Sequence, residues 1–246
     1  MSALSLKLDT SKDWQSEAKR FAETGRTQAQ GVLEDASAKV LHELIAGQPN
    51  WNAVFDRHGT HVDLNANGLS VLTPQQMSGL LGHLHETAAQ GFQYFFANIP
   101  LYDIYHSGRE AAAGLRDLYE FINGEAFLDT CRTLTGFDSI AFADAQITRY
   151  GPGQFLTRHD DNVEGKNRLA AFVLNMTPQW RAEWGGTLEF YDEPGNVLEG
   201  FMPAFNTLNL FKVPQSHAVT YVPPFAGGYR YGITGWLRYG EDPKGN

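Results

Sequence analysis

The sequence predicts an α+β protein in which a β-jelly-roll core packs against N-terminal helices. Up to about residue 136, apolar residues recur mainly at helical spacing. From about residue 140, short apolar runs alternate with glycine- or proline-bearing connections, which is typical of a sandwich or barrel. No obvious linker separates the two parts. We therefore expect one domain over 1–246, with a helix-rich part at 1–136 and the core at about 140–240.

The helices of the first part are predicted from their apolar stripes and end signals. In residues 33–45, the side chains of Val40, Leu41 and Leu44 recur on one helix face. Thr73 can cap a second helix, in the pattern of a capping box. Two more helices are expected over 110–121 and 125–134, and two short strands over 51–56 and 91–96.

Strands dominate the second part. Residues 145–150 alternate between polar and apolar, and residues 169–176 form a nearly continuous apolar run, as expected of a strand covered on both faces. Further strands are predicted over 187–191, 207–213, 218–222 and 229–237.

Composition limits the partners and the compartment. A net charge of −9 gives no electrostatic footprint for nucleic acid, so none is expected as a partner. The single cysteine, Cys131, fits a reducing compartment. Neither a signal peptide nor a membrane-spanning run is visible, so we expect a soluble, cytoplasmic protein. The oligomeric state stays open.

A possible metal site comes from three residues in the second part. On an extended strand, His159 and Asp161 would leave the same face, whereas Asp160 would point away. His217 lies far downstream, before another predicted strand. Two imidazoles and one carboxylate are the facial set that holds non-haem iron(II) with open positions. By itself a His-x-Asp string also arises by chance, so a surface role is the competing interpretation.

The remaining histidine pairs are weaker candidates. His58 and His61 lie in a turn-rich connection, where a structural or solvent-exposed role is favoured. His83 and His85 fall two apart on a predicted helix and would face different ways.

Arg230 suggests a binding site for an anion. In the last predicted strand, Arg230, Gly232, Thr234 and Trp236 share one face. An arginine inside a small barrel needs an anionic partner, and a dicarboxylate would suit its guanidinium. If the strand faces the other way, Arg230 simply points to solvent.

Together these motifs resemble the prolyl-hydroxylase branch of the iron(II)- and 2-oxoglutarate-dependent oxygenases. The resemblance covers about residues 140–238. It is carried, in order, by Tyr150-Gly-Pro-Gly-Gln-Phe-Leu-Thr-Arg-His159-Asp-Asp161, Arg168, Leu174-Asn175, Trp180, Gly185-Gly186-Thr-Leu-Glu-Phe-Tyr191, Pro214-Gln-Ser-His217 and Arg230-Tyr-Gly-Ile-Thr234-Gly-Trp236.

The resemblance implies a double-stranded β-helix and a specific set of site residues. It makes His159, Asp161 and His217 the ligands of Fe(2+). It implies that Arg230 binds the C5 carboxylate of 2-oxoglutarate, with Thr234 and Tyr150 near this co-substrate, and that O2 is the oxidant. Arg168 and Trp180 are the candidates for substrate contact.

The resemblance also implies hydroxylation of a substrate with release of succinate and CO2. A prolyl residue in a protein is the leading substrate, and a free amino acid or other small molecule is the closest alternative. A metal-binding jelly roll without catalysis is a further possibility. This chain departs from many relatives at Val173, where they carry a tyrosine that reaches the co-substrate.

Overall fold

One large antiparallel sheet organises the chain. The computed structural model describes residues 4–108 and 114–245. In this part of the chain the sheet has twelve strands, ten of them in the order β1-β10-β7-β12-β5-β4-β6-β11-β8-β9; β2 pairs with β4, and β3 pairs with β2. The strands are β1 (Arg26–Gln30), β2 (Asn52–Arg57), β3 (Thr60–Leu64), β4 (Tyr94–Ile99), β5 (Phe142–Tyr150), β6 (Phe155–His159), β7 (Arg168–Asn175), β8 (Leu188–Tyr191), β9 (Val197–Phe201), β10 (Thr207–Lys212), β11 (His217–Val219) and β12 (Arg230–Arg238).

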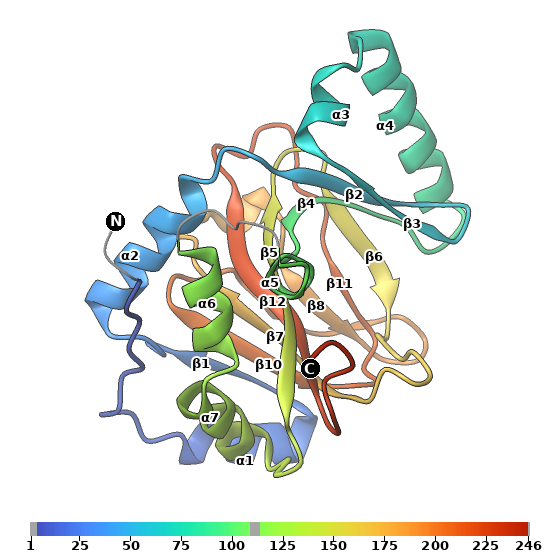
Figure 1. Ribbon diagram of the computed structural model, residues 1–246. Coiled ribbons are helices and arrows are strands. Elements are labelled where there is room, and N and C mark those ends of the chain that lie inside the picture. Colours follow the sequence, from blue (N-terminus) through green and yellow to red (C-terminus); the bar gives the residue numbers. More distant parts are fainter. Residues whose placement is uncertain (1–3, 109–113, 246) are drawn as a thin grey trace.

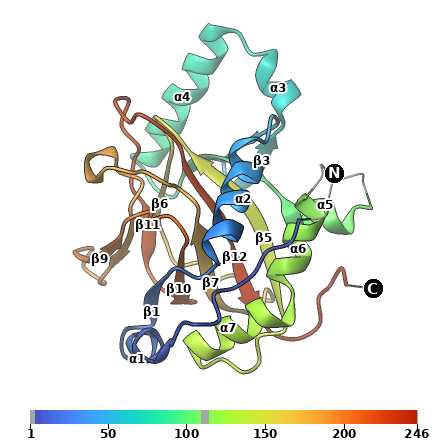
Figure 2. The ribbon, with the colours of Figure 1, turned by 90° about the vertical axis from the view of Figure 1, so that its left-hand side faces the viewer.

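The sheet curls into a nearly closed barrel, as the two views in Figure 1 and Figure 2 show. The predicted α+β jelly roll with N-terminal helices is therefore confirmed. The helices are α1 (Gln15–Thr24), α2 (Asp35–Ala46), α3 (Ala66–Ser70), α4 (Pro74–Ala88), α5 (Leu101–His106), α6 (Leu115–Ile122) and α7 (Glu125–Thr135), and a 3-10 turn spans η1 (Ala182–Trp184).

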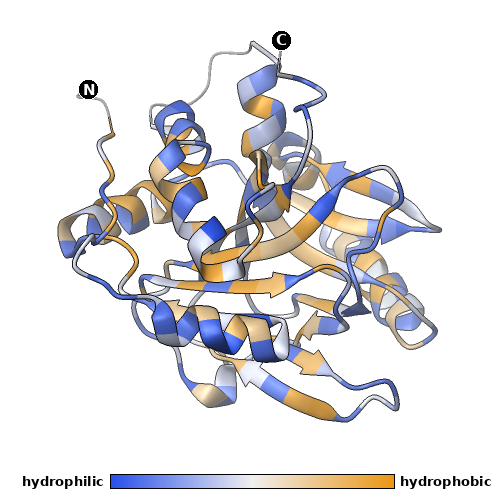
Figure 3. Ribbon diagram, turned by 90° about the horizontal axis from the view of Figure 1, so that it is seen from below, coloured by the Kyte–Doolittle hydropathy of each residue, from blue (hydrophilic) through white to orange (hydrophobic). Residues whose placement is uncertain are grey.

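The main core lies between the barrel and the helices on one side of it. Leu41 of α2, Leu118 of α6 and Phe127 of α7 belong to the same buried cluster as Phe172 and Leu174 of β7. In Figure 3, hydrophilic and hydrophobic residues interleave along the helices, as expected for elements with one face in this core. Burial of this apolar area is the main stabilising contribution to such a fold.

Strand β7 explains the continuous apolar run of its sequence. Phe172 and Leu174 face the helices, whereas Ala171 and Val173 belong to a second cluster inside the barrel. The prediction of a strand covered on both faces is confirmed. One face of β7 builds the core, and the other lines the interior where a ligand could lie.

The first part of the chain contains more sheet than the sequence suggested. The strand expected at 91–96 lies at β4, three residues later, and β1 and β3 were not expected at all. The sequence of β1, Arg26-Thr-Gln-Ala-Gln30, lacks a clear apolar alternation, yet all five residues pair with β10. Main-chain pairing to an existing sheet edge therefore decides its conformation, and local side-chain pattern does not.

Helix predictions succeed where end signals are strong. Thr73 and Gln76 form the expected capping box at α4, and α7 matches 125–134 closely. The helix expected over 110–121 is described from α6 at Leu115 onward, and residues 110–113 fall outside the described part. Val40 was expected on the buried face of α2 but is 46% exposed, because that helix turns Ala38 and Leu41 inward.

Helices α3 and α4 stand apart from the others, beside the β2–β3 hairpin (Figure 1). Leu84 of α4 is fully buried in a third cluster with Phe95 of β4 and Phe155 of β6. This small core holds α3 and α4, called here the α4 arm, against the outer face of β4 and β6. The inner face of these strands borders the barrel cavity. Among residues 4–108 and 114–245, no helix is long and apolar enough to cross a bilayer.

Candidate metal centre and its cavity

The barrel interior encloses a cavity of about 550 Å³. The three candidate metal ligands line it, and so do Arg168 and Arg230. Residues that are far apart in the sequence meet here because β6 and β11 are paired antiparallel, with His217 directly opposite His159. The sequence-based grouping of these histidines is thus confirmed by their positions.

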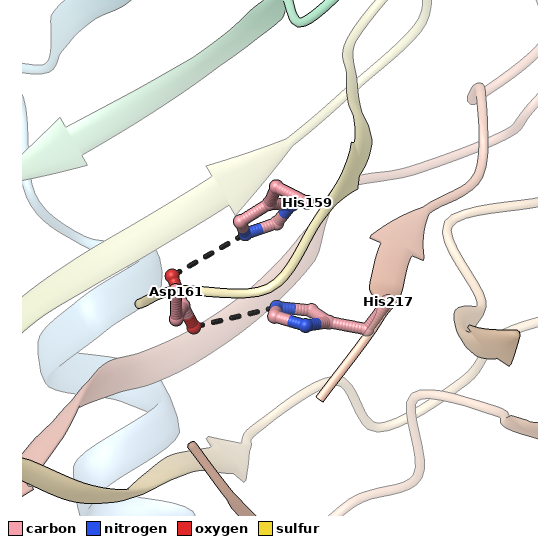
Figure 4. A group of neighbouring side chains, drawn as sticks. All are labelled: His159, Asp161 and His217. Carbon is pink, nitrogen blue, oxygen red and sulfur yellow. Dashed lines mark ion pairs between the residues drawn. The ribbon is translucent and has the colours of Figure 1, made fainter. Parts of the chain in front are cut away.

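His159, Asp161 and His217 converge on one point (Figure 4). The Nε2 atoms of His159 and His217 lie 3.4 Å from Oδ1 and Oδ2 of Asp161, respectively. All three ligand atoms lie within 4.8 Å of one another, and among the described residues this is the one such group. Two imidazoles and a carboxylate on one side of an open space fit a ferrous ion with free positions for reactants.

The tautomer of each histidine is set by a main-chain carbonyl. Nδ1–H of His159 donates to the carbonyl oxygen of Thr157 at 2.9 Å, and Nδ1–H of His217 donates to that of Gln215 at 2.7 Å. Each Nε2 then keeps its lone pair for a metal, since a neutral imidazole has one donor and one acceptor nitrogen.

Electrostatics keep His217 and Asp161 in the protonation states that a metal requires. Burial lowers the pKa of His217 to about 4, and the nearby His159 adds to the shift, so His217 is neutral near pH 7. Burial acts to raise the pKa of Asp161, but its polar contacts with His159, His217 and Trp236 outweigh this effect, and the pKa lies below its ordinary value. The carboxylate is therefore ionised and able to bind a cation.

Asp161 reaches the site by an unusual backbone conformation. Strand β6 ends at His159, and Asp161 has φ of 64°, in the left-handed region. Asp161, and not Asp160, lies beside the two histidines as expected, but the extended strand assumed for it is wrong. Asp160 is exposed and accepts a hydrogen bond from the backbone N–H of Asn162.

Arg168 holds the main chain at Asp161. Its Nη1 donates to the carbonyl oxygen of Asp161 at 2.9 Å. Its guanidinium lies 3.5 Å from the centre of the Trp236 ring, which fixes the plane of the group. Arg168 was expected to contact substrate. It lines the cavity, but one of its donors is already used on the metal-ligand loop.

Arg230 points into the cavity, which is the orientation that an anion site on its strand requires. It is only 4% exposed and forms no ion pair with any described residue. Its Nη1 has no hydrogen-bond partner, and its guanidinium lies over the Tyr150 ring at 5.1 Å. Burial lowers the pKa of Arg230. A buried cation without a partner is costly, so the site fits a carboxylate from a ligand.

The other expected co-substrate residues also line the cavity. Tyr150 and Thr234 both do so, and the structure records no hydrogen-bond partner for either hydroxyl within the described chain. Val173 lines it too, opposite Thr234, and offers no donor. A Cβ at Gly232 would lie 3.3 Å from the carbonyl oxygen of Leu174 and 3.4 Å from the Val173 side chain, so a larger residue would fit closely against β7.

Trp180 does not reach the cavity. It is not among the lining residues, and its indole N–H donates to the carbonyl oxygen of Gly185 at 2.8 Å. Its ring packs edge to face on Trp184. The proposed substrate contact of Trp180 has no support in this geometry.

Sequence reasoning missed an aromatic wall of the cavity. Phe92, Tyr94 and Phe96 line it together with Tyr150, and consecutive ring centres lie 5.1 to 5.8 Å apart. His61 of β3 joins at the outer end, where its Nδ1 lies 2.7 Å from the Tyr94 hydroxyl. The period-two spacing of Phe92, Tyr94 and Phe96 could have predicted that they share one face of a strand. No local pattern indicated that His61 would join them.

Comparison with known proteins agrees with this site. The sequence profile described as the 2OG-Fe(II) oxygenase superfamily matches residues 145–238, which include all three candidate ligands and Arg230. A protein named prolyl 3-hydroxylase OGFOD1 from Xenopus laevis is 32% identical over 120 residues, 46% of this chain and 23% of that protein. Its namesake in Mus musculus is 34% identical over 111 residues, 42% of this chain and 20% of that protein. The matched part thus spans less than a quarter of these curated relatives.

Solved structures share the fold over nearly the whole chain. A prolyl-4-hydroxylase from Pseudomonas putida has a TM-score of 0.57 and 18% identity, covering 93% of this chain and 100% of that one. A prolyl hydroxylase from Trichoplax adhaerens, solved with a peptide fragment of the hypoxia inducible factor oxygen degradation domain, has a TM-score of 0.55 and 19% identity, covering 94% of each chain. At such identities the likeness establishes the double-stranded β-helix fold alone.

Proposed function

We propose that this chain, whose residues 145–238 match the 2OG-Fe(II) oxygenase superfamily, is a prolyl-hydroxylase-like oxygenase that hydroxylates a prolyl residue in a protein. One oxygen atom of O2 enters the substrate C–H bond as a hydroxyl, and the other enters succinate as 2-oxoglutarate loses CO2. Iron(II), when bound, supplies the activation of dioxygen that couples these two oxidations.

The observation that carries the oxygenase chemistry is the unpaired Arg230 in the same cavity as the three-residue cluster. The cluster fits iron(II), and the buried guanidinium fits a carboxylate. A dicarboxylate with a 2-oxo acid group satisfies both at once. A metal-binding module without catalysis would have no use for a buried, unpaired arginine, which makes that alternative the weaker one.

The aromatic wall supports a ring-shaped, uncharged substrate group. Phe92, 50% exposed at the outer end of the wall, has its ring centre 5.4 Å from that of His159. Tyr94 and Phe96 continue the wall inward. A pyrrolidine ring placed on these faces would bury apolar surface beside the metal site, with water excluded from the reaction.

A free amino acid is the second candidate, and it rests on two charged residues. Asp160 and Arg168 both line the cavity and could bind an ammonium and a carboxylate. Each already has a protein partner, since Asp160 accepts from Asn162 and Arg168 donates to Asp161. Peptide-bonded proline needs neither charge, which favours a protein substrate.

The oxygenase chemistry can be tested without knowing the substrate. Purified wild-type protein with iron(II), O2 and 2-oxoglutarate should form succinate slowly in uncoupled turnover. The His159→Ala variant should form none, while His85→Ala, altered at an exposed histidine of α4 outside the cavity lining, should match wild type. Absence of succinate with wild type, or equal rates in wild type and His159→Ala, would contradict the proposal.

The substrate class needs a separate measurement. A peptide library with a central proline and randomised neighbours, a matched library with central alanine, and free L-proline are each incubated with the complete enzyme. Mass spectrometry should find a gain of one oxygen on the central proline of the first library alone. Oxidation of free L-proline alone would instead establish the amino-acid hydroxylase.

A further inference from the structure

Val173 cannot donate a hydrogen bond to the co-substrate, and Gln146 lies nearby on the same wall of the cavity. We propose that the side-chain amide of Gln146 donates to the co-substrate carboxylate held by Arg230, and so acts as an additional co-substrate-binding residue. The proposal rests on 2-oxoglutarate being the co-substrate, as proposed above.

The strand register puts Gln146 and Val173 on either side of Thr234. On β12, Thr234 is paired with Gln146 of β5 and with Val173 of β7. Directly opposite residues of neighbouring strands point to the same face, about 4.8 Å apart in the hydrogen-bonding direction. All three side chains line the cavity, so a donor lost on the β7 side can be supplied from the β5 side.

Asn98 turns the amide of Gln146 in the required direction. Asn98, only 3% exposed, donates from Nδ2 to Oε1 of Gln146 at 2.8 Å. This bond engages the acceptor of the Gln146 amide and leaves its Nε2 as the free end. Within the described chain, Nε2 has no hydrogen-bond partner.

Several hydrogen-bond donors beside Gln146 have no acceptor in the described chain. Arg230 has an unpaired Nη1, and the hydroxyls of Thr234 and Tyr150 have no partner in the described chain. No carboxylate of the described residues forms an ion pair with Arg230. An amide donor beside these groups strengthens binding of a carboxylate and does nothing for an apolar ligand.

The test is the binding of 2-oxoglutarate, measured by calorimetry on the full chain loaded with manganese(II), which does not require turnover. Gln146→Met keeps the size of the side chain and removes its donor, and we expect the Kd for 2-oxoglutarate to rise about tenfold. Gln146→Glu puts a negative charge beside the ligand and should weaken binding further. The exposed Gln30→Met, on β1 away from the cavity, is the matched control and should bind as wild type does.

A second ligand separates direct contact from a structural effect. 2-Oxovalerate has the 2-oxo acid group but carries a methyl group in place of the distal carboxylate. The Kd for 2-oxovalerate should be the same in Gln146→Met and in wild type. An equal loss for both ligands would show that the substitution disturbs the pocket in general, and would overturn the proposed contact.

The remaining outcomes are also decisive. If wild type and Gln146→Met bind 2-oxoglutarate equally, the role of Gln146 is refuted and the proposed oxygenase function stands. If manganese-loaded wild type binds no 2-oxoglutarate, the proposed function fails and this inference fails with it. The affinity for manganese(II) itself should be the same in all variants, because Gln146 belongs to none of the metal-binding side chains.

Discussion

The main chain just before each histidine orients the rings of His159 and His217 for metal binding. Each donates Nδ1–H to the carbonyl two residues before it, at Thr157 and Gln215. This repeated local bond fixes ring orientation and tautomer before any ion arrives, and such partners commonly tune metal affinity. The residue that needs help from outside its element is Asp161, since its left-handed backbone lies beyond the end of β6.

Arg168 gives that help, and this leads to a prediction about metal affinity. Lysine at position 168 keeps the charge but loses the planar fork that both donates to Asp161 and stacks on Trp236. We expect Arg168→Lys to weaken manganese(II) binding about tenfold, measured by calorimetry. Arg181→Lys, which changes an exposed arginine paired with Glu183, is the control. An unchanged affinity in Arg168→Lys would contradict a positioning role.

Arg230 allows a prediction in which binding and stability separate. Methionine at position 230 removes the unpaired buried charge, so the apo protein should unfold at the same temperature as wild type or higher. The same Arg230→Met change should weaken 2-oxoglutarate binding by at least about a hundredfold, since a buried charge pair is lost. Manganese(II) affinity should be unchanged. Tight binding of 2-oxoglutarate by the variant would refute the carboxylate site.

At the scale of elements, β12 does the most to define the site. It lies between β5 and β7, and its inward residues Arg230, Gly232 and Thr234 run along the cavity in register with both neighbours. The alternation of a strand gives these residues one face. The structure decides that this face is the inner one.

The α4 arm depends on its first turn, which gives a prediction for that element. The Thr73 hydroxyl accepts from the backbone N–H of Gln76, and the Gln76 side chain accepts from that of Thr73. Thr73→Ala should lower the free energy of unfolding by about 1 kcal/mol in urea titration, whereas Thr73→Ser keeps the cap and should cost little. Equal losses in both variants would argue against the capping bond as the cause.

At the scale of the whole molecule, closure of the sheet assembles the centre. His159 lies at the end of β6, Asp161 in the loop after it, and His217 at the start of β11. Strands β6 and β11 are paired because the sheet curls into a barrel. A metal and a dicarboxylate bound between them should therefore stabilise the folded barrel as a unit.

This coupling can be measured by thermal unfolding. With manganese(II) saturating and 2-oxoglutarate at about a hundred times its Kd, mass action adds about 2.7 kcal/mol. For a chain of this size we expect Tm to rise by roughly 5–10 °C. A chelator should reverse the shift, and Arg230→Met should respond to the metal but not to 2-oxoglutarate. No shift in wild type would show that the native barrel does not bind this pair.

The sequence by itself determined the class of the fold, the three candidate metal ligands and the buried arginine beside them. Period-two strands and capped helices are local patterns, and His159, Asp161, His217 and Arg230 stand in a recognisable order. These features can be predicted from the sequence because side-chain alternation and helix capping depend on only a few neighbouring residues.

Only the tertiary structure decided what depends on pairing between distant strands. The polar β1 became a strand by joining the edge of β10, and the aromatic wall acquired His61 from a hairpin far away in sequence. Tertiary packing likewise excluded Trp180 from the cavity and brought Gln146 beside Thr234. Register and barrel closure are global properties of the sheet, because each strand gains its hydrogen bonds from partners that its own sequence does not name.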